Sequence, residues 1–301
     1  MKVSITGVSG FVGQNLITYI QNFHNLQFIS RQGLSSIVEQ PLQNESNVII
    51  HLAGKAHDLK KVSDPNEYYQ VNFELTKKLY DAFLQSDAKK FIFISSVKAA
   101  ADSVNGILTE DATPHPQTDY GKSKLMAEHY IQSQPLPEGK SYYILRPCMI
   151  HGPGNKGNLN LLYQFVKKGI PYPLAGFDNK RSFLSVENLC FIIKELIERD
   201  DIVSGVYHVA DDEPLSTDEV VSILSASINK KPKLWKISPS LIRAVAKLGD
   251  VLHFPLTTER LDKLTESYVV SNQKIKHAIG KDLPLTVRKG LEITAASFAT
   301  K

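Results

Sequence analysis

Short apolar runs rich in β-branched and aromatic residues recur along this chain of 301 residues, and longer stretches with helical spacing separate them. Several of the runs are apolar throughout rather than alternating, which is typical of parallel strands covered on both faces. Because strands alternate with helices, the pattern predicts an α/β fold with a doubly wound parallel sheet. The predicted strands are Val3–Val8, Leu26–Ser30, Asn47–Ala53, Lys90–Ser96, Tyr142–Pro147 and Val206–Ala210.

One interval in this pattern is short. Residues 31–46 leave little room for a helix and a strand, since a crossover alone takes a dozen or more residues. We therefore expect the third strand and its helix to be shortened or missing at the edge of the sheet. The predicted helices are Phe11–Phe23, Pro65–Ser86, Gln117–Ser133, Asn158–Lys168, Val186–Arg199, Ser216–Ile228 and Ser271–Ile279.

After Pro147 the chain changes character, because Gly, Pro and Asn-rich loops separate the helical stretches. This change divides the chain into a sheet domain, residues 1–150, and a smaller, mostly helical part, residues 151–301. One or two segments of the second part are expected to return to the sheet.

The composition excludes several classes of protein. Thirty-five Lys and Arg against 31 Asp and Glu leave a net charge of only +4, without a run of basic residues, which argues against nucleic-acid and membrane partners. The two cysteines, Cys148 and Cys190, are too few for a disulfide framework or a thiolate metal site. No stretch approaches the length of an apolar membrane span. We expect a cytoplasmic protein with no metal site.

A glycine-rich loop, Thr6-Gly7-Val8-Ser9-Gly10-Phe11-Val12-Gly13, follows the first strand and opens the first helix. In this spacing Gly7 permits a tight turn, Gly10 lets the backbone approach a pyrophosphate, and Gly13 lets the helix pack on the strand. The helix N-terminus offers N–H groups and a favourable dipole to phosphate. The motif predicts a Rossmann-type dinucleotide site that includes Phe11 and Val12, and an ordinary strand-to-helix turn is the alternative.

The end of the second strand bears on which dinucleotide binds. An acidic residue there accepts the ribose 2′-hydroxyl of NAD, whereas an arginine suits the 2′-phosphate of NADP. Here the strand ends at Ser30-Arg31. Arg31 therefore favours NADP(H) over NAD(H), although NAD binding without the acid also occurs.

Tyr120 and Lys124 stand four residues apart and share one face of a predicted helix. A phenol with a pKa near 10 is a poor acid or base at neutral pH, and a nearby ammonium group lowers that pKa. The strand ending in Ser95-Ser96 places hydroxyl groups at the sheet edge where ligands of open α/β sheets bind. A Tyr-x-x-x-Lys pair alone is common on helix surfaces, but its combination with the glycine loop and these serines indicates an active site.

Together these motifs resemble the extended short-chain dehydrogenase/reductase family, from Thr6 to about Gly290. The segments His51-Leu52-Ala53-Gly54, Val71-Asn72, Leu145-Arg146-Pro147 and Ile150-His151-Gly152-Pro153-Gly154 extend the match. The resemblance implies that Tyr120 is the acid/base, that Lys124 tunes it and holds the nicotinamide ribose, and that Ser96 binds the reacting oxygen. Ser95 could share the role of Ser96.

The same resemblance implies further contacts to the dinucleotide and a quaternary structure. Asn72 stabilises the local backbone, and a homodimer forms through the helices Pro65–Ser86 and Gln117–Ser133. The residues implied to flank the dinucleotide are Leu52, Ala53, Gly54, Ser95 and Pro147.

The second half resembles the branch of this family that acts on nucleotide sugars. Asn158 opens a helix where related enzymes contact the nucleotide diphosphate, and Arg181-Ser182-Phe183-Leu184-Ser185-Val186-Glu187-Asn188 resembles a segment whose arginine grips that diphosphate. A guanidinium can bind two phosphates bidentately, although a loop arginine in a surface ion pair is the alternative for Arg181. The resemblance implies a nucleotide-diphospho-sugar substrate, UDP-linked, bound by residues 151–301.

Departures from the family pattern narrow the reaction. Val97-Lys98 stands where sugar 4,6-dehydratases carry Asp-Glu, so dehydration is disfavoured. A 4-epimerase with bound NAD and an NADPH-dependent 4-ketoreductase remain. Arg31 and the segment Ser96-Val97-Lys98, which resembles 4-ketoreductases of polysaccharide biosynthesis, favour the reductase. Lys98 either faces the substrate or is solvated.

A protein of another class, a non-catalytic dinucleotide sensor, can share this fold. Such sensors typically lose the tyrosine or the lysine. Ser96, Tyr120 and Lys124 are all present, which favours an enzyme.

Overall fold

The computed structural model describes residues 1–36, 46–55, 64–155, 157–252 and 256–299. A six-stranded sheet forms its centre, with the strand order β2-β1-β3-β4-β6-β9. Every adjacent pair is parallel, as the apolar runs predicted. The strands are β1 (Lys2–Thr6), β2 (Asn25–Ile29), β3 (Val48–His51), β4 (Lys90–Ile94), β6 (Ser141–Pro147) and β9 (Gly205–Val209).

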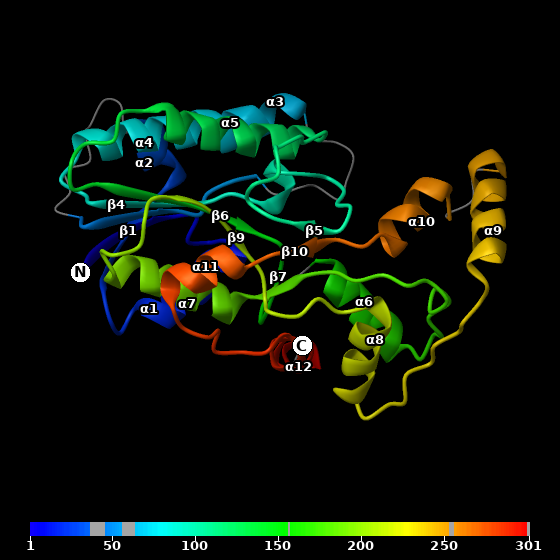
Figure 1. Ribbon diagram of the computed structural model, residues 1–301. Coiled ribbons are helices and arrows are strands. Elements are labelled where there is room, and N and C mark those ends of the chain that lie inside the picture. Colours follow the sequence, from blue (N-terminus) through cyan, green and yellow to red (C-terminus); the bar gives the residue numbers. More distant parts are fainter. Residues whose placement is uncertain (37–45, 56–63, 156, 253–255, 300–301) are drawn as a thin grey trace.

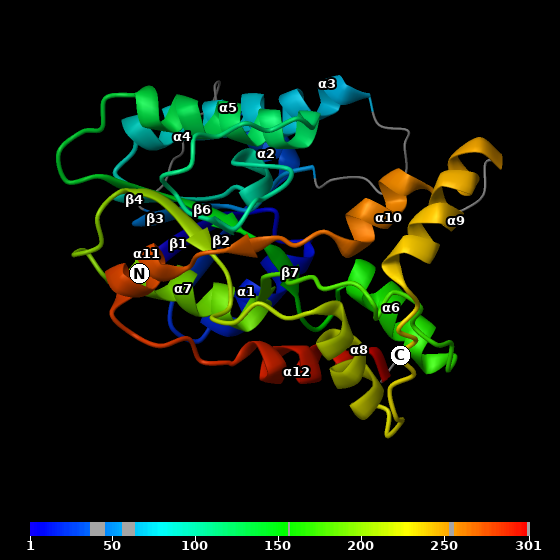
Figure 2. The ribbon, with the colours of Figure 1, turned by 45° about the vertical axis from the view of Figure 1, so that its right-hand side comes forward.

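Helices cover both faces of this sheet (Figures 1 and 2). One face packs on α1 (Phe11–Ile20) and α7 (Val186–Glu198), and a shared cluster of buried aliphatic side chains fills the space between them. The other face packs on α4 (Leu75–Gln85) and α5 (Asp119–Ser133) through a second, more aromatic cluster. Strands β3 and β4 are buried at every residue, which is why their sequences are apolar without alternation except at His51 and Lys90.

The expected shortening at the edge of the sheet agrees with the described residues. After β2 the chain forms the six-residue helix α2 (Arg31–Ser36), and the next described strand, β3, lies on the other side of β1. The described residues place no strand outside β2. The order therefore reverses at β1, which creates the switch point where open α/β sheets bind ligands.

The second half of the chain forms a mostly helical layer beside the sheet (Figure 1). A third buried cluster joins α6 (Asn158–Lys167), α8 (Thr217–Ala226) and α12 (Val287–Ala299). Segments of this half return to the sheet as β9 and α7, and α11 (Gln273–Ile279) packs beside β9. Two small parallel pairs complete it: β5 (Ile107–Leu108) with β10 (Val269–Val270), and β7 (Met149–His151) with β8 (Phe183–Ser185).

Several helices differ from the sequence-based prediction. The predicted helix Pro65–Ser86 divides into α3 (Pro65–Tyr68), a π-helical segment (Tyr69–Glu74) and α4. Helices α2, α9 (Pro239–Leu252), α10 (Thr258–Thr265) and α12 were not predicted. Across the described residues, no helix combines the length and the apolarity needed to cross a bilayer.

Candidate active site

The glycine loop lies directly against the backbone that follows β3. Gly7 has a left-handed φ of +70°, and a Cβ atom on it would stand 2.6 Å from the amide nitrogen of Ala53. A Cβ on Gly13 would stand 2.4 Å from the carbonyl oxygen of Gly7. Both approaches require glycine. Gly10 is the N-cap of α1 and contributes no side-chain cap, so the first-turn amides of the helix suit an anion.

A cavity of about 300 Å³ opens beside this loop, at the carboxyl ends of β1, β2 and β3. The predicted cofactor residues Gly7, Gly10, Leu52, Ala53 and Gly54 line it. The side chain of Arg31, the residue on which the NADP preference rested, lies outside the described part of the structure. The remaining lining residues are Val8, Ser9, Ile29, Ser30, Leu34, Val71 and Leu75. A narrow cavity against uncapped helix amides fits the phosphates of a dinucleotide.

A buried chain of hydrogen bonds supports the loop from below. Thr76 Oγ1 donates to the carbonyl oxygen of Asn72 at 2.7 Å and therefore accepts from His51 Nε2 at 2.9 Å. His51 Nδ1 in turn accepts from Thr6 Oγ1 at 2.7 Å. Thr6 Oγ1 accepts from the amides of Leu52 and Ala53. Each donor faces an acceptor only if His51 is neutral with its proton on Nε2.

The neutral state of His51 predicts a pH dependence of stability. Burial, with a smaller effect of the Lys124 ammonium, lowers the pKa of His51 to about 3. Because the unfolded imidazole titrates at about 6.5, the unfolded state binds more protons between these values, and stability falls as the pH drops through that window. From this group we expect the free energy of unfolding to be about 2 kcal/mol lower at pH 5 than at pH 7.

Urea unfolding at the two pH values measures this difference. His51→Gln should flatten it, whereas His129→Gln, a matched change on the exposed face of α5, should leave it intact. An equal pH dependence in both variants would contradict a neutral His51 between the Thr6 and Thr76 hydroxyl groups.

Asn72 connects the end of β3 to the helix that carries the predicted catalytic pair. It lies buried in the π-helical segment, a kind of irregularity often found at functional sites. Its side chain accepts from the amide of Lys55 at 2.8 Å and donates to the Lys55 carbonyl and to Ser123 Oγ, each at 3.1 Å. The expected role of Asn72, stabilising local backbone, agrees with these contacts.

The structure brings Ser96, Tyr120 and Lys124 together at the carboxyl end of β4. Ser96 caps a 3₁₀ turn (Val97–Ala99), and a hydrogen bond joins its side chain to Tyr120. Lys124 lies one turn further along α5, and its Nζ donates to the carbonyl oxygen of Ile94 at 2.9 Å. A Cβ on Gly54 would stand 3.1 Å from the same Nζ, so the lysine reaches the wall of the dinucleotide cavity.

The pKa of Tyr120 moves in the direction opposite to the sequence-based expectation. Burial raises the pKa of Tyr120, and the hydrogen bond from Ser96 offsets only part of that rise. Burial also lowers the pKa of Lys124 to about 8, against an opposing effect of Glu128. The expectation that Lys124 lowers the pKa of Tyr120 is therefore wrong for the protein without ligands. The ammonium group is directed to the strand below, and desolvation dominates.

Ser95 and Ser96 point in different directions. The Ser95 hydroxyl donates to the carboxylate of Glu128, which is completely buried and forms an ion pair with Arg146 at 2.5 Å. The expectation that Ser95 shares the role of Ser96 is not supported by this geometry. The network Ser95–Glu128–Arg146 was missed in the sequence, because its members come from β4, α5 and β6 and meet only in the folded sheet.

Among the remaining predicted residues, Pro147 lies buried at the end of β6, and Asn158 is exposed at the first turn of α6. Lys98 Nζ donates to the carbonyl oxygen of Asp102 at 2.7 Å and lies 4.3 Å from the ring centroid of Tyr268. Lys98 is thus held inside the protein rather than solvated.

Arg181 already has protein partners at the end of α10. Its Nε donates to the carbonyl oxygen of Glu266 at 3.1 Å, and one terminal nitrogen donates to the carbonyl of Lys263. A cation at the C-terminus of a helix is electrostatically favourable. This contact stabilises the helix, and diphosphate binding by Arg181 stays a prediction.

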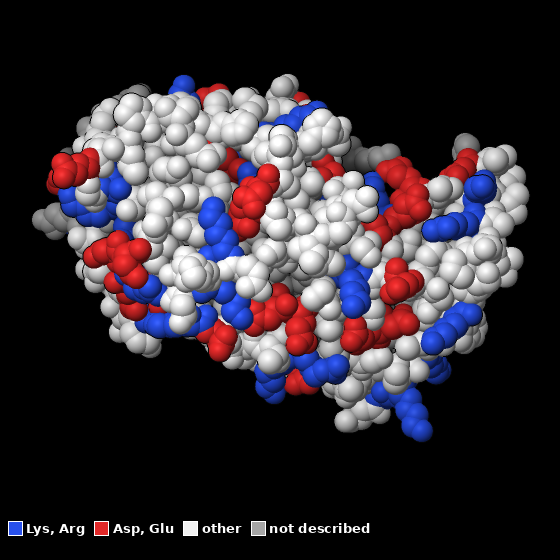
Figure 3. Space-filling model, viewed as in Figure 1, with Lys and Arg blue, Asp and Glu red and all other residues white. Residues whose placement is uncertain are grey.

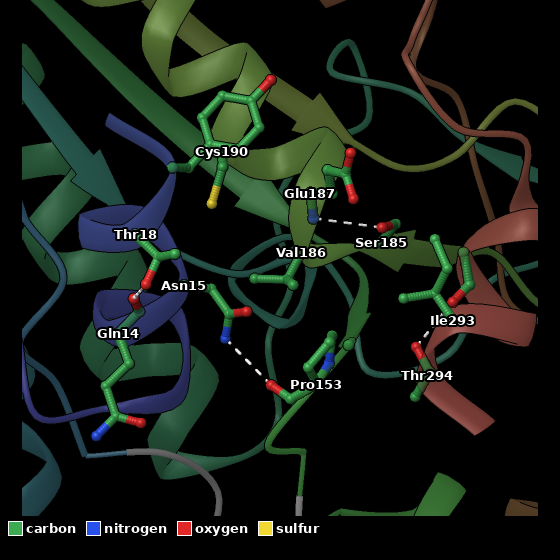
Figure 4. Close-up of a pocket in the computed structure, with 13 residues that line it drawn as sticks. Gln14, Asn15, Thr18, Pro153, Ser185, Val186, Glu187, Cys190, Ile293 and Thr294 are labelled. Atoms are coloured by element: carbon green, nitrogen blue, oxygen red, sulfur yellow. Dashed lines mark hydrogen bonds between the residues drawn. The ribbon is translucent and has the colours of Figure 1, made fainter. Parts of the chain in front are cut away.

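A second cavity, of about 580 Å³, lies between α1, α7 and α12 (Figure 4). Asn15, Glu187 and Thr294 line it from the three helices. None of the predicted site residues is among those that line it, whereas five of the predicted cofactor residues line the smaller cavity beside the glycine loop. Within the described ranges, no group of three or more His, Cys, Asp or Glu side chains is placed to hold a metal ion.

Known proteins resemble this chain over most of its length. The profile of the NAD dependent epimerase/dehydratase family matches residues 3–210. A UDP-glucose 4-epimerase of Vibrio cholerae is 30% identical over 99% of this chain and 95% of its own length. An N-acetyl-alpha-D-glucosaminyl-diphospho-ditrans,octacis-undecaprenol 4-epimerase of Escherichia coli O157:H7 is 27% identical over 97% and 94% of the two chains. A GDP-6-deoxy-D-mannose reductase of Pseudomonas aeruginosa is 25% identical over 74% and 79%.

This chain therefore belongs to the NAD-dependent epimerase/dehydratase family, among the nucleotide-sugar enzymes of the extended short-chain dehydrogenases/reductases. Two solved structures show the same fold, each covering 100% of this chain and 99% of their own, with a TM-score of 0.77 and 20% identity. They are MoeE5 in complex with UDP-glucuronic acid and NAD, and RMD from Pseudomonas aeruginosa complexed with NADPH. Proteins of this fold thus accommodate either dinucleotide.

Proposed function

We propose that this enzyme reduces a 4-keto nucleotide-diphospho-sugar with NADPH, in surface-polysaccharide biosynthesis. The observation that carries the proposal is the hydrogen-bonded pair Ser96–Tyr120 at the carboxyl end of β4, one helical turn from Lys124. The phenol of Tyr120 carries a proton at neutral pH, and its hydrogen bond with Ser96 places it to donate that proton to an oxygen bound between the two side chains. Reduction of a ketone needs such a donor, whereas oxidation of an alcohol needs a base. Arg31 and the segment Val97-Lys98, which favoured a reductase in the sequence, also support reduction with NADPH.

In the proposed reaction the protein supplies a proton and fixed hydrogen bonds. The nicotinamide, when bound, supplies the hydride. Ser96 orients the keto oxygen, and Tyr120 donates its proton to that oxygen as negative charge develops on it. Lys124, at the cavity wall beside Gly54, holds the nicotinamide ribose. Gly7, Gly10 and the first turn of α1 hold the pyrophosphate.

The second half of the chain completes this proposal. We assign residues 1–150 to the cofactor and residues 151–301 to the sugar nucleotide, with Asn158 and Arg181 at its diphosphate. Arg181 would then exchange at least one α10 carbonyl for phosphate on binding. We also propose a homodimer through α4 and α5, as the family resemblance implies.

A second candidate is a UDP-hexose 4-epimerase with tightly bound NAD. The observation in its favour is the relative named a UDP-glucose 4-epimerase, whose similarity extends over 99% of this chain. Epimerisation needs Tyr120 to act as base and acid in turn. A positive nicotinamide ring next to the phenol would lower its pKa and favour the first of these steps.

One measurement separates the two candidates. The purified protein should oxidise NADPH when it is given a UDP-4-keto-6-deoxy-N-acetylhexosamine, and it should bind NADP(H) more tightly than NAD(H). Arg31→Asp should reverse that preference. Co-purified NAD together with interconversion of UDP-hexoses, without net consumption of NADPH, would establish the epimerase instead.

A further inference from the structure

Helix α9 presents an apolar stripe to the solvent. Leu241, Val245, Leu248 and Leu252 are 60%, 46%, 59% and 57% exposed and follow one another at spacings of four, three and four residues. This spacing places them on one face of the helix. A neighbouring set with the same spacing, Ile242, Ala246 and Gly249, lies about 100° around the helix and is buried against the protein. The helix thus has two apolar faces, of which the protein covers only one.

Two contacts hold α9 in this orientation. The guanidinium of Arg243 lies 5.8 Å from the ring centroid of Phe177. The carboxylate of Asp250 accepts from the amide of Thr258 at 2.9 Å, which ties the end of α9 to α10. The exposed stripe is therefore presented by a helix that is fixed at both ends.

The chain around this stripe is strongly basic. Residues 229–252 contain six lysines and arginines against a single aspartate, a larger positive excess than the +4 of the whole chain. Figure 3 shows basic side chains over α9 and, further down the same edge, over the segment that leads to it. Lys230, Lys231 and Lys233 also line a cavity of about 280 Å³ between α6 and α8.

The connection to α9 also carries an aromatic side chain. Trp235 is 56% exposed, and backbone pairing of Leu234 and Lys236 with Tyr172 and Leu174 fixes its position in the fold. Tryptophan beside a basic amphipathic helix is typical of a segment that lies in a membrane interface.

We propose that α9 and the segment 229–238 form a docking surface for an anionic lipid membrane. The leucines and Val245 enter the boundary between headgroups and acyl chains, and the lysines meet the anionic headgroups. A second copy of this chain fits the surface less well, because two copies would bring their own lysines together. The sequence-based expectation of no membrane partner used the charge of the whole chain, in which this local excess is hidden.

The test uses Trp235, the single tryptophan of the chain. With vesicles of equal parts phosphatidylglycerol and phosphatidylcholine, its fluorescence should shift to shorter wavelength and the protein should float with the lipid. The protein should bind pure phosphatidylcholine vesicles at least about tenfold more weakly than the anionic vesicles, and added salt should release it from the anionic vesicles.

Two variants and a control sharpen this test. Leu241→Ser/Leu248→Ser should lose flotation, and Lys230→Gln/Lys231→Gln/Lys233→Gln should lose the preference for the anionic lipid. Val203→Ser, a change at another exposed apolar residue, should bind like the wild type. If the wild type does not float, or if Leu241→Ser/Leu248→Ser instead dissociates an oligomer in light scattering, the membrane proposal fails. Turnover of the sugar nucleotide is measured separately, so the two proposals fail independently.

Discussion

Tyr120→Phe should lower kcat by about 10²- to 10⁴-fold while the protein stays folded and still binds the dinucleotide. The substitution removes the one phenolic proton that lies next to Ser96 at the carboxyl edge of the sheet. It keeps the ring and its contact with Tyr68, whose centroid is 6.1 Å away. The loss of one hydrogen bond should change the free energy of unfolding by only about 1 kcal/mol.

The matched control is Tyr130→Phe in the same helix. Tyr130 donates to Asp81 at 2.5 Å, away from the dinucleotide cavity. This variant therefore loses a comparable hydrogen bond but keeps Tyr120, the proposed proton donor of the reaction. Steady-state turnover and dinucleotide titration of the wild type, Tyr120→Phe and Tyr130→Phe measure the difference in kcat and in cofactor affinity. Full turnover by Tyr120→Phe would remove Tyr120 from the chemistry and revive the non-catalytic sensor.

The sequence predicted the sheet well because its strands are buried on both faces. In β3 and β4 apolar residues occupy both faces, with His51 and Lys90 as the polar exceptions, and such short unalternating runs are typical of parallel strands. Helix α9, by contrast, was missed although its apolar residues recur at helical spacing, on one buried and one exposed face.

In the candidate site, too, some residues could be predicted from the sequence and others could not. Gly7, Gly10 and Gly13, and likewise Tyr120 and Lys124, are close in sequence, so the combination of their spacings predicted them. The chain Thr6–His51–Thr76 and the pair Glu128–Arg146 join residues from separate elements. Their partners follow from strand order and register, which a single sequence does not specify. The direction of the Tyr120 pKa shift was missed because burial, which raises it, has the largest effect.

The pair Glu128–Arg146 provides the second large effect, this time on stability. Both side chains are buried, and Arg146 donates to Glu128 through Nε at 3.0 Å as well as through a terminal nitrogen. Glu128→Gln removes the negative charge and leaves the guanidinium buried without a counter-ion. We expect a loss of about 3–5 kcal/mol in the free energy of unfolding, measured by urea denaturation.

The exposed pair Glu259–Lys263 on α10 is the matched control, because Glu259→Gln breaks an ion pair of similar length in water. That variant should change stability by at most about 1 kcal/mol. Glu128→Leu/Arg146→Met, which removes both buried charges, should recover much of the loss, since no charge is then left unpaired. If Glu128→Gln were as stable as Glu259→Gln, the buried charge would have found another partner. His208 Nε2, 3.5 Å from Arg146, can accept a hydrogen bond because burial and the guanidinium lower the pKa of His208 to about 4 and keep the ring neutral, but it offers no negative charge.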